Sequence, residues 1–220
     1  MSELWEVLQE HFPEFSSGLW VTTRLVVAAF LVAMAVGTLV AALRIAPVRA
    51  LNWLGGLYVE AFRNIPLLVL LIIAFSGLPR EGVPIDQWQA GIGCLGLYTA
   101  AYIAEALRSG VFAVGKGQIE AALSLGLTYP RTMRLIILPQ AARTVIPTLG
   151  SLVLAMIKNS AIVGGSIVAL NDLLHNTRRI ASDTGQYNEV FFWGAVGFLF
   201  LTLATTLIFR YLERRFQIKR

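Results

Sequence analysis

The sequence predicts an all-α protein, an integral membrane bundle of five transmembrane helices in one domain that covers residues 1–220. Three observations support this fold class. Hydrophobic residues make up 56% of the chain, the mean hydropathy is +0.68, and the apolar residues are clustered in long blocks. Only 14% of the residues are charged, whereas soluble domains carry about 25%. This composition excludes a disordered chain and argues against an ordinary soluble domain.

Five blocks come close to the roughly 20 apolar residues that a helix needs to cross the hydrocarbon core. They are residues 19–43, 51–75, about 88–107, 145–170 and 190–209. The second block contains Glu60, Arg63 and Pro66, and the fourth contains Lys158 near its middle. We therefore expect five spans, of which the second and the fourth are interrupted by charge.

Residues 1–18 precede the first span. They contain four glutamates, no Lys or Arg, and no small-residue cleavage site, so they do not resemble a secretory signal. A short amphipathic helix on the outer membrane surface fits their apolar residues Leu4, Val7, Leu8 and Phe12. A solvated acidic leader fits equally well, and both readings place this segment outside the membrane.

Positive charges are divided unevenly between the two sets of connecting segments. The segments that follow the first, third and fifth blocks hold twelve of the 18 Lys and Arg residues, including Lys219 and Arg220, whereas the opposite segments hold three. Lys and Arg accumulate in cytoplasmic loops. We therefore expect the N-terminus outside and the C-terminus in the cytoplasm. The polar segment 171–189 then lies outside, where it either contacts a binding protein or is solvated.

Several other function classes find little support in the sequence. Cys94 is the one cysteine, which excludes an internal disulfide and a Cys-based metal cluster. His11 and His175 lie far apart and give no metal signal. The net charge of +5 is explained by the cytoplasmic loops rather than by a nucleic acid partner. We expect no catalytic residue, metal or cofactor, because no nucleophile with its base and no cofactor fingerprint is present.

The connection formed by residues 108–144 is the longest on the cytoplasmic side, and loops of this length usually carry function. Residues 118–126 predict a short amphipathic helix, and Gly126 suits a C-terminal cap with a left-handed backbone. Pro130 suits the first turn of a second helix, which Pro139 ends or kinks. On local chemistry alone, the loop is either functional or an interfacial helical hairpin that covers the bundle.

Four motifs in this chain resemble those of one transporter family. Glu120, Ala121, Ala122 and Gly126 have the spacing of the EAA loop, which marks the permease subunits of bacterial ABC importers. Residues 58–68 resemble the "VExxRNTPLL" segment of the polar amino acid branch, and residues 101–110 resemble its "AYxAExxRGG" segment. Lys158, Asn159 and Ser160 resemble its "KNTS" segment. Four ordered motifs over five spans make the resemblance to permeases of polar amino acid uptake strong.

The resemblance implies the fold of a type I ABC importer permease and a place in the bacterial cytoplasmic (inner) membrane. It implies four partners: ATP-binding cassette ATPase subunits, a second permease subunit (identical or related), an extracytoplasmic solute-binding protein, and a polar amino acid. Gly115 and Lys116 lack the flanking residues of a phosphate-binding loop. We therefore expect ATP to be hydrolysed by a separate subunit, and this chain to be a transport subunit rather than an enzyme.

The resemblance also assigns residues 108–144 as a coupling loop whose short helix docks on the ATPase. Ala121 and Ala122 are small enough for close packing, and Gly126 permits a sharp exit from the helix. Two roles are open for Glu120, which either meets a basic residue of the ATPase or caps its own helix.

Charged residues inside the spans are the candidates for substrate binding, because each costs about 2.5–3.5 kcal/mol on insertion scales unless it faces a cavity or a partner. In one hypothesis, Arg63 and Lys158 hold the α-carboxylate of the amino acid and Glu105 holds its α-amine. Glu60 either binds the ammonium group or pairs with Arg63. In the alternative, both acids form internal salt bridges, with Arg108 three residues after Glu105.

Two mid-depth cations favour an acidic or neutral amino acid, such as glutamate or glutamine, over a cationic one. The main alternative to an ATP-driven importer is a secondary transporter or channel subunit driven by an ion gradient. Five spans without a visible inverted repeat argue against it. A membrane-embedded enzyme is the weakest interpretation, for the reasons given above.

Overall fold

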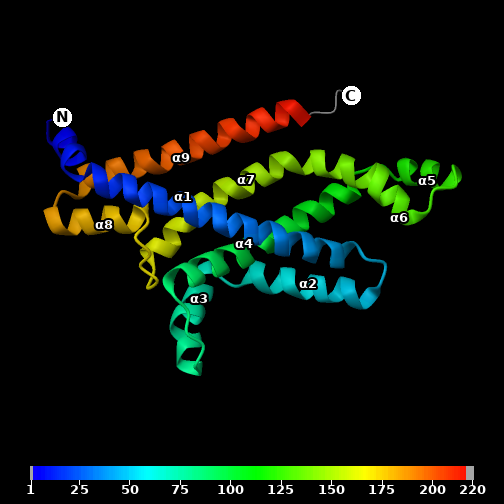
Figure 1. The fold of residues 1–220 in the computed structure, drawn as a ribbon, viewed down its shortest axis with the longest axis horizontal. Helices are drawn as coiled ribbons and strands as arrows, with labels where there is room; N and C mark the ends of the chain where they lie inside the picture. The colour runs from blue at the N-terminus through cyan, green and yellow to red at the C-terminus, as the bar shows by residue number, and fades with distance from the viewer. Residues whose placement is uncertain (1, 217–220) are drawn as a thin grey trace.

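The computed structural model describes residues 2–216, and these residues form helices and connecting turns without a strand. The bundle is elongated, and its long helices run along it (Figure 1). One end holds the N-terminus and α8, and the opposite end holds α5 and α6 (Figure 1). We refer to these as the α8 end and the α5 end. The helices are α1 (Ser2–Ile45), α2 (Arg49–Asn64), α3 (Leu67–Ile72), α4 (Gln87–Phe112), α5 (Lys116–Ser124), α6 (Tyr129–Thr132), α7 (Leu138–Gly165), α8 (Leu173–Thr184) and α9 (Tyr187–Phe216).

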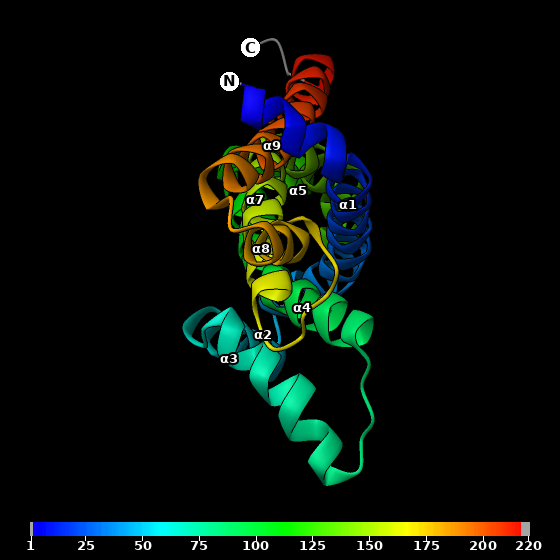
Figure 2. The same ribbon diagram turned by 90° about the vertical axis from the view of Figure 1, so that its left-hand side faces the viewer.

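Four helical segments are long and apolar enough to cross a membrane, and a bent pair of helices makes up to a fifth span. The pair is α2 and the segment from α3 through a π-helical turn (Ile73–Gly77) to a 3₁₀ turn (Leu78–Glu81), and the bend between them is 96°. This agrees with the predicted all-α membrane bundle. The second span departs from a straight rod, and α3 projects sideways from the bundle (Figures 1 and 2).

The bend follows from Pro66. Proline disfavours the helical conformation in the preceding residue, and Ile65 is extended at φ −90° and ψ 125°. Proline also lacks the N–H that would continue the hydrogen-bond ladder. As a result α2 ends at Asn64, and Arg63 lies in its last turn.

Pro139, unlike Pro66, does not interrupt its helical segment. The expectation that Pro139 ends its helix is therefore wrong. Residues 129–165 form one continuous helical segment of 37 residues. A π-helical turn at Met133–Ile137 comes directly before Pro139, so the proline falls in the first turn of α7. In the first turn of an α-helix the backbone N–H has no partner within the helix, so the missing N–H of proline costs no hydrogen bond there.

Small residues bring α1 and α4 into close contact along the middle of the bundle. A Cβ atom added to Gly37 would lie 2.9 Å from the Ala100 carbonyl oxygen, and one added to Gly96 would lie 3.1 Å from the Ala29 carbonyl oxygen. Ala29 and Ala100 are themselves fully buried. Lipid tails are as apolar as leucine side chains, so membrane helices associate through close packing of this kind.

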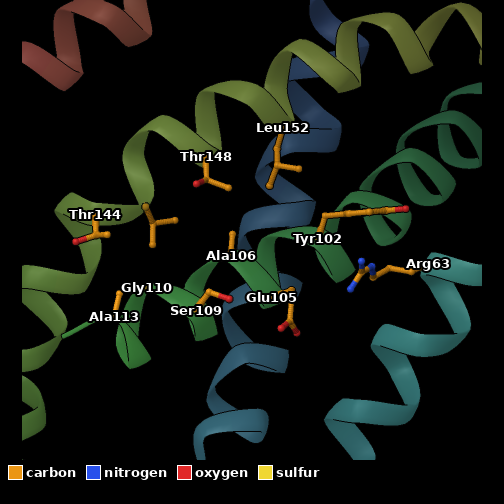
Figure 3. A pocket seen from close by; sticks show the side chains of 11 residues that line it. Arg63, Tyr102, Glu105, Ala106, Ser109, Gly110, Ala113, Thr144, Thr148 and Leu152 are labelled. Carbon is orange, nitrogen blue, oxygen red and sulfur yellow. The ribbon is translucent and has the colours of Figure 1, made fainter. Parts of the chain in front are cut away.

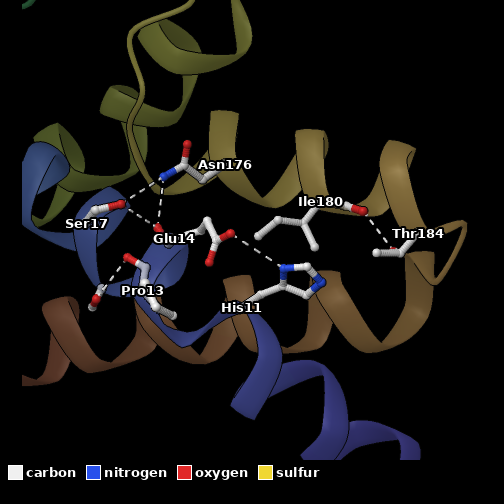
Figure 4. A network of polar contacts seen from close by, with 8 residues as sticks. His11, Pro13, Glu14, Ser17, Asn176, Ile180 and Thr184 are labelled. Carbon is white, nitrogen blue, oxygen red and sulfur yellow. Dashed lines mark hydrogen bonds and ion pairs between the residues drawn. The ribbon is translucent and has the colours of Figure 1, made fainter.

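The first turns of α1 pack against α8 and α9 at the α8 end. Val7 and Phe15 are buried with Leu173 and Ile180 of α8 and Val190 of α9. Asn176 donates a hydrogen bond to the Glu14 carbonyl oxygen at 2.8 Å (Figure 4). Trp193 donates to the Leu4 carbonyl oxygen at 2.7 Å. Residues 2–18 are therefore helical except for a kink at His11 (φ −109°, ψ 15°), and they contact the rest of the protein.

Asp172 caps the N-terminus of α8 and is fully buried. Its Oδ1 accepts a hydrogen bond from the His175 backbone N–H at 2.8 Å, whereas its Oδ2 has no partner among the described residues. The carboxylate lies directly on Gly164, where an added Cβ atom would collide with Asp172 Oδ1. Burial raises the pKa of Asp172 to about 7, against the opposing effect of the backbone N–H groups.

We expect the Asp172→Asn variant to lose part of the pH dependence of stability. The unfolded carboxyl has a pKa of about 3.9, so the folded protein holds an extra proton between that value and about 7. The free energy of unfolding therefore falls as the pH rises through this window. The measurement is the thermal midpoint in detergent at pH 5 and at pH 8. The fall between these two values should be smaller in the Asp172→Asn variant, because Asn does not ionise.

The matched control is Asp183→Asn, which alters an exposed carboxylate on the same helix. It should keep the pH profile of the unmodified protein. Identical pH profiles in the unmodified protein and the Asp172→Asn variant would contradict a raised pKa of Asp172.

Candidate functional site

Two adjoining cavities lie beside α4, one between α1, α2 and α4 and the other between α2, α4 and α7. One has a volume of about 430 Å³ and contains Arg44, Glu60 and Asn64 in its wall. The other has a volume of about 420 Å³, and its wall includes Ser109, Thr144 and Thr148 (Figure 3). Arg63, Tyr102 and Glu105 line both cavities. These three side chains therefore form the boundary between the two spaces.

Arg63 reaches this boundary because α2 ends one residue after it. Its guanidinium carbon lies 5.2 Å from the centre of the Tyr102 ring, which is a cation–π distance. The Tyr102 hydroxyl is in turn 3.1 Å from the Tyr98 hydroxyl. Within residues 2–216, Arg63 is exposed and forms no salt bridge. Its charge is available to an anionic group that enters the cavity.

Glu105 is held by two arginines. Arg108, one turn later on α4, donates to Glu105 Oε1 through Nε at 3.0 Å and also through Nη2. Arg44, at the end of α1, places Nη1 3.2 Å from Glu105 Oε2. Two roles were predicted for Glu105, and the structure contains the internal salt bridge. The same carboxylate also borders both cavities. The cluster of Arg44, Glu105 and Arg108 ties α1 to α4.

Glu60 lies one turn before Arg63 on α2 and lines the first cavity. Its side chain is exposed, and the described structure contains no ion pair between Glu60 and Arg63. Its backbone carbonyl accepts a hydrogen bond from the Asn64 side chain at 2.7 Å. The Glu60 carboxylate is therefore open to the cavity.

Lys158, Asn159 and Ser160 point in three directions, because consecutive helical residues are turned by about 100°. Asn159 lines a third cavity of about 260 Å³, whose wall also includes Tyr98 and Tyr102. Ser160 is fully buried, and its hydroxyl donates to the Ile157 carbonyl oxygen at 2.7 Å. Lys158 is exposed on the surface of α7. The structure thus gathers Arg63, Glu60, Glu105 and Asn159 around Tyr102 and leaves Lys158 and Ser160 apart from them.

Two cavity residues were missed by the sequence reasoning. Tyr102 lies in the segment 101–110 that resembles a family motif. A tyrosine in a membrane helix can simply pack against its neighbours, so the residue type alone does not indicate a cavity. Arg44 was counted only as a cytoplasmic charge. Its contact with Glu105 joins residues 61 positions apart, and no local pattern signals a contact over that distance.

The short helix α5 lies at the far end of the molecule from α8 (Figure 1). Glu120 and Ala121 are exposed on it, and Ala122 is buried. The N-cap residue of α5 is Gly115, and no side chain caps this end within the described structure. This does not favour the alternative in which Glu120 caps its own helix.

Gly126 ends α5 in the predicted left-handed conformation, with φ at +81°. Its N–H donates to the Leu123 carbonyl oxygen at 2.9 Å, and the Leu127 N–H donates to the Ala122 carbonyl oxygen at 3.1 Å. This pair of hydrogen bonds is the Schellman motif. The chain therefore turns sharply away from α5 and leaves one face of that helix exposed.

No group of three His, Cys, Asp or Glu side chains within the described ranges is placed to hold a metal ion. The cavities carry instead a free guanidinium, a free carboxylate, an amide and several hydroxyl groups. Such a set can bind a small zwitterion, because the Arg63 guanidinium and the Glu60 carboxylate line the same cavity.

Relatives of known type share the sequence and the fold. The chain is 41% identical over 211 residues to the probable glutamine ABC transporter permease protein GlnM of Bacillus subtilis (strain 168), covering 96% of this chain and 97% of that protein. It is 32% identical over 204 residues to the arginine transport system permease protein ArtQ of the same organism, covering 92% of each chain. A solved structure titled as an amino acid ABC transporter with histidines is similar with a TM-score of 0.89 and 33% identity, over 95% of this chain and 97% of that one.

Residues 23–218 match the family described as the inner membrane component of binding-protein-dependent transport systems. The match covers most of the 220 residues, and it agrees with the transport role that the sequence motifs imply. This chain therefore belongs to the family of inner membrane components of binding-protein-dependent transport systems.

Proposed function

We propose that this chain is the transmembrane subunit of an ATP-driven importer of polar amino acids, located in the bacterial cytoplasmic membrane. The observation that carries the proposal is α5, an exposed helix with the residues Glu120, Ala121 and Ala122, ended sharply at Gly126 in a member of this transporter family. A separate ATPase that moves α5 would move α4 and α7, because α5 joins those two helices. Such movement alternates the access to the cavities between them.

The charge distribution supports an orientation with the α5 end in the cytoplasm. Arg44, Arg108, Arg131 and Arg134 belong to the segments at this end, as do the exposed Arg210 and Arg214 of α9. Lys219 and Arg220, which were also counted on this side, lie outside the described residues. Cytoplasmic segments attract Lys and Arg, so α5 meets a cytoplasmic ATPase and the N-terminus lies outside.

The cavity lined by Arg63 and Glu60 supports an amino acid as substrate. Arg63 is the free cation for an α-carboxylate, and Glu60 is the free acid for an α-ammonium group, because Glu105 is already paired with two arginines. Arg44, Arg63 and Arg108 outnumber the two glutamates, which favours a neutral or acidic amino acid such as glutamine or glutamate. Relatives named for glutamine and for arginine transport both exist, so the side chain of the substrate is the finer part of this proposal.

Lys158 supports a second permease subunit. It lies within the candidate span Tyr129–Gly165, in the part nearer Gly165, and its side chain is exposed in the single chain. An ammonium group that faces lipid inside a span is costly, up to about 3.5 kcal/mol at the centre of the bilayer. A second permease, identical or related, removes this cost when the translocation path between the two subunits borders α7. An extracytoplasmic solute-binding protein then delivers the amino acid at the α8 end.

Reconstitution tests the proposed function directly. The chain should take up labelled glutamine or glutamate into proteoliposomes only with its ATPase, its binding protein and ATP. The chain alone, under a proton or sodium gradient, should show no uptake. Uptake driven by an ion gradient without an ATPase would overturn the importer proposal in favour of a secondary transporter.

Substitutions in α5 test the coupling role. We expect Glu120→Lys to lower uptake per ATP hydrolysed by about tenfold, which corresponds to the loss of about 1.4 kcal/mol of docking energy. Gly126→Val should act similarly, because a β-branched residue does not adopt a left-handed backbone readily, whereas Gly126→Asn should retain coupling. Uptake and ATP hydrolysis are measured on the same proteoliposomes.

The control for this series is Gln118→Ala, an exposed position on the same helix. It should leave uptake and hydrolysis unchanged. Normal coupling in both Glu120→Lys and Gly126→Val would count against docking at α5.

Lys158 and Arg63 are tested by their effect on transport at constant protein fold. Lys158→Ala and Arg63→Gln should each reduce uptake by at least about tenfold, as expected for one lost charge-assisted hydrogen bond. Lys158→Arg should retain more uptake than Lys158→Ala, because it keeps the charge. Monodisperse elution in detergent serves as the check on folding. Full uptake by Lys158→Ala would make Lys158 a structural residue.

A further inference from the structure

A groove at the α8 end is not used by the transport proposal. It has a volume of about 640 Å³ and lies where the end of α7, the side of α3 and one face of α8 meet. Figure 2 shows these elements from the α8 end, with α3 extending away from the bundle. Because three separate elements form its walls, the groove is a property of the tertiary structure.

One wall of the groove is cationic. Arg178, Arg179 and His175 of α8 line it, and both arginines are exposed. Arg178 is held in place through Nη1, which donates to the Gly165 carbonyl oxygen at 3.0 Å. Arg179 forms no ion pair with the acids of the described residues, although Asp183 is one turn away. The remaining N–H groups of two guanidiniums are therefore available to an anion.

The facing wall is apolar. Leu68 and Ile72 of α3 are 45% and 43% exposed, and Ile167, just after α7, is 49% exposed. These three side chains form no hydrogen bonds with water and no favourable contact with a free inorganic anion. A ligand that fits both walls must itself be amphipathic.

The position of the groove matches the level of lipid headgroups. The candidate span that contains α7 ends at Gly165, and α8 lies between this span and the next one, which begins at Tyr187. α3 belongs to the bent pair that also counts as a span. The groove is therefore bounded by membrane-embedded helices on one side and by a polar helix outside the spans on the other.

We propose that this groove binds an anionic phospholipid. The phosphate accepts hydrogen bonds from Arg178 and Arg179, and an acyl chain lies along Leu68 and Ile72 of α3. Arginine is suited to this role because its planar guanidinium can bind two phosphate oxygens at once. An acidic protein segment would pair with the arginines but would not contact the apolar wall. An anionic phospholipid contacts both walls, so we favour it.

Thermal unfolding of the purified full chain in a neutral detergent tests the proposal. A ligand that binds only the folded state raises the unfolding midpoint. We expect phosphatidylglycerol to raise the midpoint by several degrees more than phosphatidylcholine does at the same mole fraction. The Arg178→Gln/Arg179→Gln double variant should lose at least half of that difference, whereas the control Arg210→Gln/Arg214→Gln, at the opposite end of α9, should keep it.

Further arms separate the source of the phosphate and the effect on folding. Inorganic phosphate and water-soluble glycerophosphoglycerol should give no comparable shift, because neither has an acyl chain. Arg179→Gln alone leaves the Arg178 bond to Gly165 intact and should still weaken the phosphatidylglycerol effect. Equal shifts with both lipids, an undiminished shift in the double variant, or an equal shift with inorganic phosphate would each overturn the proposal.

Discussion

The close approach of α1 and α4 is the constraint on which the rest of this structure depends. In a membrane the helices gain no hydrophobic energy by leaving lipid for one another, so contact must come from backbones that approach closely. Gly37 and Gly96 each face a carbonyl oxygen of the other helix, with room for no Cβ atom between them. This contact fixes α4, and α4 carries Tyr102, Glu105 and the connection to α5. α1 also holds the start of α8, where the Leu173 N–H donates to Thr22 Oγ1 at 3.0 Å.

The ion cluster at the end of this helix pair sets the electrostatics of the cavities. Ionisable groups inside a membrane persist when they are paired or face a cavity, and both conditions occur here. Arg44 and Arg108 pair with Glu105, whereas Arg63 forms no ion pair among the described residues and lies against the face of the Tyr102 ring. The unpaired cation lies against Tyr102, which comes three residues before the paired Glu105 on α4. This arrangement gives the cavity a positive site while the Glu105 carboxylate stays paired.

The prolines show why the elements were predictable and their shapes were not. The sequence predicted five apolar segments and a left-handed glycine at position 126, because each depends on local composition or backbone preference. Pro66 bends its span by 96°, whereas Pro139 lies inside a continuous segment. The difference comes from the π-helical turn before Pro139, which shifts the proline into the first turn of α7. Such a turn depends on packing against neighbouring helices, and Ile137 within it is fully buried.

The sequence by itself determined that this is an all-helical membrane protein of the binding-protein-dependent transport family, with the residues of the EAA loop on a short helix between its third and fourth spans. Those conclusions rest on composition and on residues close together in the chain. The tertiary structure decided which charged residues share a cavity. It placed Glu105 between Arg44 and Arg108, left Arg63 free on Tyr102, turned Lys158 to the surface, and formed a groove from α3, α7 and α8. The physical reason is that a helix register sets the direction of each side chain, whereas only the packing of helices decides what lies in that direction.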